Sequence, residues 1–230
     1  MTLTFQERIE YVRSRIASAA ERSGRDPVDI RVIAVTKYVS LETTRAALDL
    51  GLEHIGENRW QDVQAKWEAL HERGTWHFIG HLQTNKVKDV VGKFAYIHSL
   101  DRLSLAKEIE KKAAALGIVQ DCLIQVNVSG EESKYGLPPE ELHSFAGQLR
   151  DMPHIRVVGL MTMAPLEAEA EATRPVFREL RRLRDELNAG GTLGYEAPHL
   201  SMGMSGDFEV AIEEGATWVR LGTILVGKEA

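Results

Sequence analysis

Cysteine is nearly absent from this sequence of 230 residues, which contains only Cys122. A single cysteine cannot form an internal disulfide, and it excludes metal sites built from several cysteines. Long hydrophobic runs are also missing, since none approaches the roughly 20 apolar residues that cross a bilayer. The first residues lack the basic and apolar regions of a secretory signal. We therefore expect a cytoplasmic protein without a membrane partner, in which Cys122 is a buried apolar residue.

Positive charge is scarce, because 28 lysines and arginines stand against 34 aspartates and glutamates, for a net charge of -6. Broad nucleic-acid binding needs a positive surface, so no nucleic-acid partner is expected. The motifs G-x-G-x-x-G, G-x-x-x-x-G-K-[ST], H-E-x-x-H and G-x-S-x-G are absent. His77 and His81 lie four residues apart, which on an extended strand separates them by more than about 13 Å. No metal site is expected.

A repeated unit of helix, glycine and strand runs through the chain instead. An amphipathic helix opens it, with apolar residues at helical spacing from Phe5 to Ala20. Further helices are expected at residues 41–50, 59–73, 102–116 and 207–214, and the first glycine after each is Gly51, Gly74, Gly117 and Gly215. Glycine just past a helix adopts the left-handed cap conformation at little cost. A charge-laced helix face is expected around residues 178–186, and a helix start at the proline pair 138–139.

Short strands rich in β-branched residues follow these helices. They are expected at residues 30–37, 53–56, 75–80, 96–99, 121–128, 157–161, 199–201 and 217–222. Eight strands alternating with helices are the count of a (β/α)8 barrel, and a barrel of about 250 residues fits this length as a single domain, residues 1–230. An open doubly wound sheet uses similar units, and periodicity alone does not separate the two.

In such a barrel, chemistry lies at the carboxyl ends of the strands and in the loops that follow them. Lys37 closes the strand predicted at 30–37, where its ammonium would be partly desolvated. Desolvation lowers the pKa of a lysine and exposes a neutral amine, which can form a Schiff base with an aldehyde. The alternative is a lysine that reaches solvent from a strand end.

The last two loops carry features of a phosphate site. Ser201, Gly203, Ser205 and Gly206 follow the seventh strand and offer hydroxyls and close backbone approach. The pair 222–223 (Gly-Thr) follows the eighth strand and adds backbone N–H groups and another hydroxyl. For each loop alone, an ordinary turn is the favoured interpretation. Together with a lysine at another strand end, they suit a phosphorylated aldehyde, of which pyridoxal 5'-phosphate (PLP) is the common one.

Arg220 ends the last strand between these two loops. An arginine facing the pyridine nitrogen of PLP would keep that nitrogen unprotonated, because two positive charges should not adjoin. The alternative is an arginine in an ion pair at the rim. Four methionines near strand ends favour wall packing over ligation. They are Met161, Met163, Met202 and Met204.

Six blocks of this sequence resemble the YggS/PROSC family of PLP-binding proteins, also called PLP homeostasis proteins. They are residues 34–37 (AVTK), 54–58 (HIGEN), 76–86 (WHFIGHLQTNK), 159–163 (GLMTM), 200–207 (LSMGMSGD) and 219–223 (VRLGT). The resemblance runs from about the first helix to the end. It implies one barrel like the N-terminal domain of bacterial alanine racemase. One departure is Tyr38, since many members have Ser or Thr on each side of the lysine.

The resemblance also implies a set of cofactor-binding residues. Lys37 holds PLP as a Schiff base, Arg220 faces the pyridine nitrogen and Asn58 lies beside the ring. The phosphate is bound by Ser201, Gly222 and Thr223. Secondary candidates are Met163, Ser205 and Lys134. Lys134 is a candidate from its place in the loop after the fifth strand, on the same rim as Lys37, where it could hold PLP transiently during transfer; the alternative is a solvated loop lysine.

The family's implied role is the control of PLP (vitamin B6) supply, with no established catalytic residue. The expected partners are PLP and the apo-forms of PLP enzymes, and the expected state is a monomer. The alternative function is a PLP-dependent amino-acid racemase, which needs a base on each face of the substrate. In alanine racemases a partner subunit supplies the second base, in an arrangement that depends on a C-terminal β-domain. Because only seven residues follow Thr223, we expect no such domain here and a non-catalytic carrier.

Overall fold

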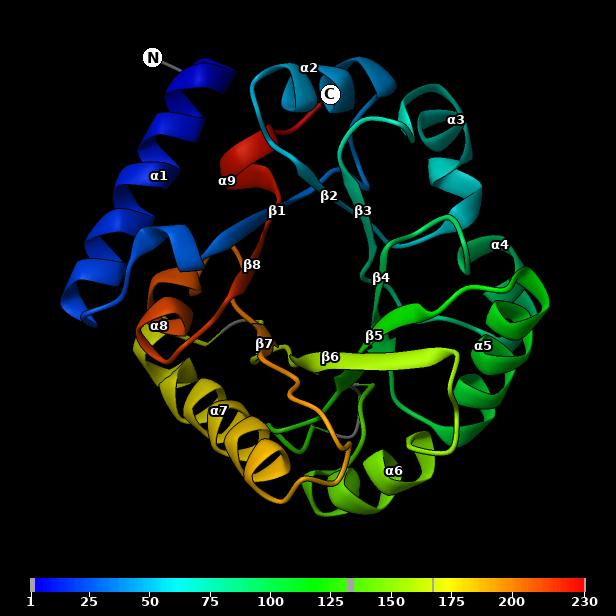
Figure 1. The fold of residues 1–230 in the computed structure, drawn as a ribbon. Coiled ribbons are helices and arrows are strands. Elements are labelled where there is room, and N and C mark those ends of the chain that lie inside the picture. Colours follow the sequence, from blue (N-terminus) through cyan, green and yellow to red (C-terminus); the bar gives the residue numbers. More distant parts are fainter. Residues whose placement is uncertain (1–2, 132–134, 167, 230) are drawn as a thin grey trace.

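Eight parallel strands close into a barrel in chain order, β1 to β8, and helices surround it (Figure 1). This computed structural model describes residues 3–131, 135–166 and 168–229. The strands are β1 (Arg31–Val35), β2 (His54–Glu57), β3 (Thr75–Phe78), β4 (Tyr96–Leu100), β5 (Gln120–Gln125), β6 (Ile155–Met161), β7 (His199–Ser201) and β8 (Trp218–Leu221). Parallel pairing of β1 with β8 completes the barrel. The predicted (β/α)8 architecture is confirmed, and an open doubly wound sheet is excluded.

The helices follow the predicted alternation. They are α1 (Phe5–Arg22), α2 (Leu41–Asp49), α3 (Trp60–Leu70), α4 (Val87–Val90), α5 (Leu103–Leu116), α6 (Leu142–Leu149), α7 (Arg174–Ala189), α8 (Phe208–Glu213) and α9 (Thr223–Val226). The four glycines expected past helices all have positive φ. The four-residue α4 was not predicted, because it is too short to show a periodic pattern. No helix in the described ranges is long and apolar enough to span a membrane.

Four strands end earlier than the sequence predicts. β1 stops at Val35 rather than at Lys37, β3 at Phe78, β5 at Gln125 and β8 at Leu221. At the end of β1 the backbone leaves the sheet and turns, since Thr36 accepts a hydrogen bond from the Val39 amide at 3.1 Å. Lys37 therefore lies in a turn beyond the strand, not at its last position.

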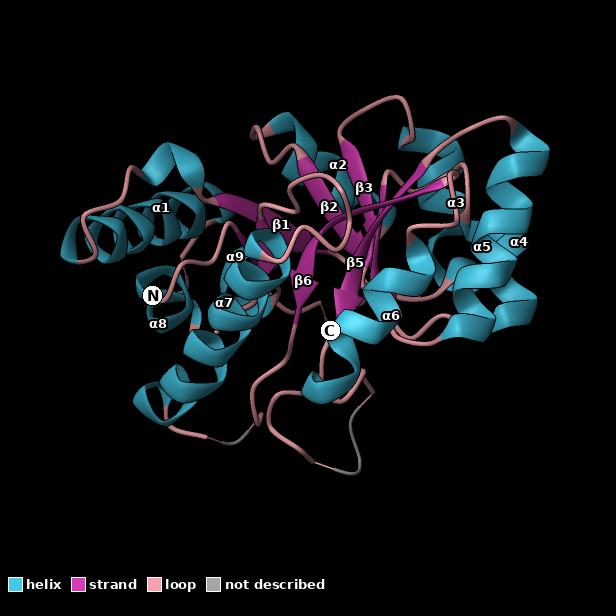
Figure 2. Ribbon diagram, turned by 60° about the horizontal axis from the view of Figure 1, so that its bottom comes forward, coloured by secondary structure: helices cyan, strands magenta, loops and turns pink. Residues whose placement is uncertain are grey.

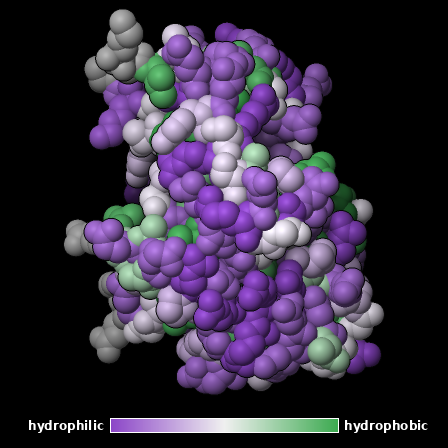
Figure 3. Space-filling view, turned by 90° about the vertical axis from the view of Figure 1, so that its left-hand side faces the viewer, coloured by the Kyte–Doolittle hydropathy of each residue, from purple (hydrophilic) through white to green (hydrophobic). Residues whose placement is uncertain are grey.

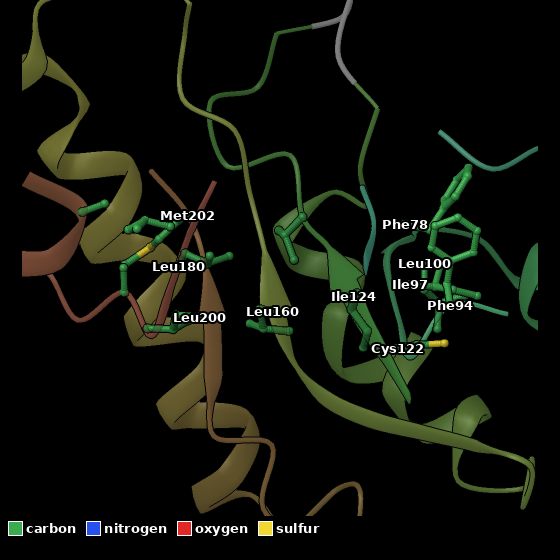
Figure 4. Packing of buried hydrophobic residues seen from close by; sticks show 14 of the residues in the cluster. Phe78, Phe94, Ile97, Leu100, Cys122, Ile124, Leu160, Leu180, Leu200 and Met202 are labelled. Carbon is green, nitrogen blue, oxygen red and sulfur yellow. The ribbon is translucent and has the colours of Figure 1, made fainter. Parts of the chain in front are cut away.

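Apolar side chains form two layers. The larger lies between the strands and the helices, and Figure 4 shows part of it, with Leu160, Leu180 and Leu200 in one region and Phe78 and Phe94 in another. The smaller fills the barrel interior. It consists of Ile33, Leu123, Val158, Met161 and Trp218.

Cys122 belongs to the outer layer and is fully buried, as predicted. Burial raises the pKa of its thiol, which keeps it protonated at neutral pH.

The outer surface is mostly hydrophilic on the face formed by α1, α7 and α8 (Figure 3). The predicted charge-laced face of α7 is confirmed by ion pairs along the helix and across to α8. Arg182 pairs with Glu179 at 2.6 Å, and Arg178 pairs with Glu214 at 3.1 Å. These arginines are matched by carboxylates, so positive and negative charges alternate along this face.

Candidate functional site

A pocket of about 480 Å³ opens at the carboxyl end of the barrel. Figure 2 shows the barrel from the side, with the loops after β5 and β6 extending at one end. The pocket brings together seven of the nine candidate cofactor-binding residues: Lys37, Asn58, Met163, Ser205, Arg220, Gly222 and Thr223. It also contains residues with no predicted role, among them His81, Tyr135 and Asp207. Lys134 lies outside the described residues.

Lys37 enters this pocket from the turn after β1. Its side chain is partly buried, and its Nζ lies 4.9 Å from the centre of the Tyr38 ring. Tyr38 is 80% exposed at the rim of the pocket. The amine therefore stands at an accessible wall of the cavity, next to an aromatic face.

A buried ion pair holds the backbone just before Lys37. The Thr36 hydroxyl donates to Glu57 Oε1 at 2.6 Å, and Lys66 Nζ donates to the same oxygen at 3.0 Å and to the Thr36 carbonyl at 2.6 Å. Burial raises the pKa of Glu57, and Lys66 and Thr36 oppose that rise. The network ties the end of β1 to β2 and α3, and so fixes the point from which Lys37 leaves the strand.

The sequence analysis missed Lys66 in this network. A signal for it exists, because Lys66 stands three residues after Val63 and four before Leu70 on the buried face of α3. A lysine on an apolar helix face needs a buried partner. Only the fold supplies that partner, because Glu57 lies on a different element.

Arg220 is buried at the end of β8 and only 4% exposed. Its Nη1 donates to Ser201 Oγ at 2.7 Å and its Nη2 donates to the Thr162 carbonyl at 3.0 Å. Burial lowers the pKa of Arg220 to about 10, and the Asp207 carboxylate opposes that shift. The guanidinium is still charged at neutral pH. Among the described residues it forms no ion pair at the rim, which was the alternative interpretation of Arg220. It presents a fixed positive charge to the pocket.

Asn58 follows β2 and lines the pocket against Gly80, which follows β3. A Cβ at Gly80 would lie 2.4 Å from the Asn58 carbonyl oxygen and 2.8 Å from its Cα. Only glycine leaves room for this contact. The two strand ends therefore bring the Asn58 backbone to its place in the wall.

The loop after β7 is held by Asp207 and by β8. Asp207 Oδ1 accepts from the Met204 amide at 2.7 Å, and the Gly203 carbonyl accepts from the Arg220 amide at 2.9 Å. Gly203 has φ of +95°, and a Cβ there would lie 2.6 Å from the Ala211 Cβ. This turn places Ser205 in the pocket wall. Ser201 is instead fully buried in the barrel and is not among the described residues that line the pocket.

His81 and Tyr135 form a stacked pair at another wall of the pocket. Their ring centres are 3.8 Å apart and their planes meet at 14°. Burial lowers the pKa of His81, and Arg102 lowers it further. The described residues contain no cluster of three metal ligands, and His77 lies in the barrel interior, away from this pair. Sequence spacing could not reveal the stack, because 54 residues separate the two rings.

These groups fit a phosphorylated aldehyde with a basic ring nitrogen. The described lining of the pocket combines one primary amine, one fixed guanidinium and two aliphatic hydroxyls, those of Ser205 and Thr223. Thr223 opens α9, and the first amides of a helix have no acceptor within the helix. Gly222 leaves the approach to this turn open, since a Cβ there would reach only ordinary contact distance from Val35.

Comparison with known proteins identifies the family of this chain. The family model of the alanine racemase N-terminal domain matches residues 10–230. A pyridoxal phosphate homeostasis protein of Aquifex aeolicus (strain VF5) is 50% identical over 223 residues, which cover 96% of this chain and 97% of that protein. The chain belongs to the pyridoxal phosphate homeostasis family. The resemblance to YggS/PROSC proteins is thereby confirmed.

Two solved structures are similar to this family member in both sequence and fold. PipY of Synechococcus elongatus PCC7942, with PLP bound, is 36% identical, has a TM-score of 0.82, and covers 94% of this chain and 100% of its own. An unknown protein from Bifidobacterium adolescentis is 37% identical, has a TM-score of 0.91, and covers 96% of this chain and 94% of its own. Both share the barrel over nearly its whole length.

Proposed function

We propose that this chain binds PLP in the pocket at the carboxyl end of the barrel and serves the homeostasis of that cofactor. The observation that carries the proposal is the meeting of Lys37, Arg220 and two hydroxyl-bearing turns around one cavity. The names of the relatives and the PLP bound to PipY support it.

The predicted residues of the pocket have separate roles in this proposal. Lys37 would hold PLP through its amine, as a covalent Schiff base with the aldehyde. Arg220, a donor that stays charged, would face the ring nitrogen and keep it unprotonated. Asn58 packs beside the ring, and Gly222 and Thr223 bind the phosphate with backbone N–H groups and a hydroxyl. Bound PLP supplies a reactive aldehyde and an electron-withdrawing ring.

Ser201, the last residue of β7, and Ser205, in the loop that follows, have different roles in the proposed binding. Ser205 lines the pocket and is our candidate for a phosphate contact alongside Thr223. The Ser201 hydroxyl is engaged with Arg220 at 2.7 Å, so its part in binding runs through that guanidinium. Met163 packs against the ligand from the loop after β6.

We further propose that the chain is a non-catalytic carrier that passes PLP to the apo-forms of PLP enzymes. An arginine at the ring nitrogen weakens the ring as an electron sink, which suits storage better than catalysis. The alternative function, an amino-acid racemase, is favoured by one observation. The Tyr135 phenol lines the same pocket as Lys37 and offers a second base.

The deciding experiment is an absorbance spectrum of the purified protein after addition of PLP. We expect a visible band that borohydride abolishes, with the reduced adduct on Lys37 by mass spectrometry. Lys37→Ala should lose the band, whereas Lys93→Ala, a lysine that lies over the Trp60 ring outside the pocket, should keep it. A full band in Lys37→Ala would refute the anchor. Rapid racemisation of alanine by the pure protein, lost in Tyr135→Phe, would refute the carrier function.

A further inference from the structure

A continuous chain of hydrogen bonds runs through the barrel interior to Arg220. His54 Nδ1 lies 2.9 Å from His77 Nε2, and His77 Nδ1 lies 2.9 Å from His98 Nε2. His98 Nδ1 lies 2.9 Å from Ser201 Oγ, which is 2.7 Å from Arg220 Nη1. The three histidines come from the neighbouring strands β2, β3 and β4, and the last two members come from β7 and β8. The chain crosses from His54, which lines a groove beside α1, to the pocket wall.

Arg220 determines the direction of every hydrogen bond in this chain. A guanidinium can only donate, so the Ser201 oxygen must accept from it. The only other partner of the Ser201 hydroxyl among the described residues is His98 Nδ1, so the Ser201 proton goes there and His98 Nδ1 is an unprotonated acceptor. A neutral imidazole has one donor and one acceptor, so His98 donates from Nε2 to His77 Nδ1. By the same step His77 donates from Nε2 to His54 Nδ1.

Burial supports the neutral state that this order requires. His77 and His98 are fully buried. Burial lowers the pKa of both imidazoles well below the ordinary range, and Arg220 lowers that of His98 further. The other rings packed on them are Tyr96 and Trp218, which bring no carboxylate to stabilise a charged imidazole.

We propose that His98 and Ser201 are positioning residues for Arg220, and that the histidine chain fixes the direction of the Ser201 hydroxyl. With the Nε2–H tautomer on His98, every donor between Arg220 and His54 has an acceptor. With the opposite tautomer, His98 would donate to Ser201, and the Ser201 proton would have no acceptor among the described residues. A buried donor without a partner is costly, so the chain holds one polarity and with it one position of the guanidinium.

The first test needs no cofactor and no substitution. Nitrogen-15 spectra of the histidine rings distinguish the two neutral tautomers and the imidazolium, and they are recorded on the full chain freed of PLP at pH 7.5. We expect the Nε2–H tautomer for His54, His77 and His98. An Nδ1–H tautomer or an imidazolium at His98 would overturn the proposal. This outcome does not depend on whether the protein binds PLP.

The second test measures how the histidine chain affects ligand binding in the pocket. Here the inference rests on the proposed PLP binding. His98→Phe keeps a ring but removes the acceptor for Ser201, and we expect a roughly tenfold rise in the Kd for PLP and a shifted absorbance band. His98→Asn restores an acceptor close to the Nδ1 position, and we expect affinity and band to return toward the wild type.

The matched control is His199→Phe. His199 also stacks on Trp218, with ring centres 4.4 Å apart. Its hydrogen-bond partner is Thr217, which is not part of the chain of hydrogen bonds that ends at Arg220. We expect it to bind PLP as the wild type does. Equal loss in His199→Phe and His98→Phe, or no rescue by His98→Asn, would reduce His98 to core packing and refute the inference. A wild-type protein that fails to bind PLP would refute the proposed function instead, and the tautomer spectrum would still decide the positioning. If His98→Phe does not fold, that spectrum decides as well.

Discussion

Lowering the pH from 7.5 to 5.5 is expected to destabilise this barrel through its buried histidines. His77 and His98 are fully buried, and burial lowers the pKa of each well below the ordinary value of about 6.5. In the unfolded chain both rings take up a proton as the pH passes through about 6.5, whereas in the folded chain they stay neutral. A lowered pKa in the folded state therefore gives stability that is present above pH 6.5 and is lost as the pH falls.

The size of the effect follows from proton linkage. One proton bound only by the unfolded state changes the free energy of unfolding by about 1.4 kcal/mol per pH unit. For an ordinary imidazole, uptake between pH 7.5 and 5.5 amounts to about 1.4 kcal/mol, so His77 and His98 together give about 2.7 kcal/mol. His54 and His199 act in the same direction, since burial lowers the pKa of both, to about 4 for His199. Both are partly exposed, so solvent screening reduces their share.

Urea unfolding at pH 7.5, 6.5 and 5.5 measures this loss. His77→Phe removes one of the two groups, so we expect the loss across this range to shrink by about 1.4 kcal/mol, whatever the variant's stability at pH 7.5. Ile33→Val is the control, because Ile33 lies in the same interior cluster and cannot titrate. It should lower stability by about 1 kcal/mol equally at each pH. A pH dependence that is the same in the wild type and in His77→Phe would refute the assignment of neutral histidines to the core.

Two further predictions concern the walls of the pocket. Lys66→Met leaves the Glu57 carboxylate buried without its cation, and urea unfolding at pH 7.5 should show a loss of about 3–5 kcal/mol. A loss below 1 kcal/mol would mean that the pair does not hold the end of β1. Gly80→Ala forces a methyl group against the Asn58 backbone, and we expect a loss of about 1–3 kcal/mol and weaker PLP binding by titration. Gly147→Ala, in open space on α6, should instead stabilise by about 0.5–1 kcal/mol with unchanged binding, and equal effects of the two alanines would contradict the contact.

Local pattern alone predicted most of the barrel, because its elements are short, amphipathic and separated by breakers. The glycines after four helices and the β-branched runs gave the number and order of the strands. The ends of the strands were predicted less accurately. Lys37 lies past the end of β1, in a turn next to the bond between the Thr36 hydroxyl and Glu57, and no local preference reveals a bond across 21 residues.

The candidate site divides in the same way. Its residues Lys37 and Arg220 were found because a parallel barrel brings the carboxyl ends of all its strands to one face, whereas Asn58 was named only by the family resemblance. Ser201 shows the limit of that reasoning. It stands at a strand end like the others, yet its hydroxyl is buried under Arg220, because successive residues of a strand point to opposite sides and only the barrel decides which neighbours they meet.

The sequence by itself determined that eight strands alternate with helices, that one lysine and two hydroxyl-bearing loops belong to their ends, and that disulfides play no part. Each of these rests on spacing along the chain or on residue counts. Only the tertiary structure decided that His54, His77, His98, Ser201 and Arg220 form one directed chain of hydrogen bonds. Their order comes from the closure of the barrel, which sets side by side residues up to 103 positions apart, and from a guanidinium that can only donate.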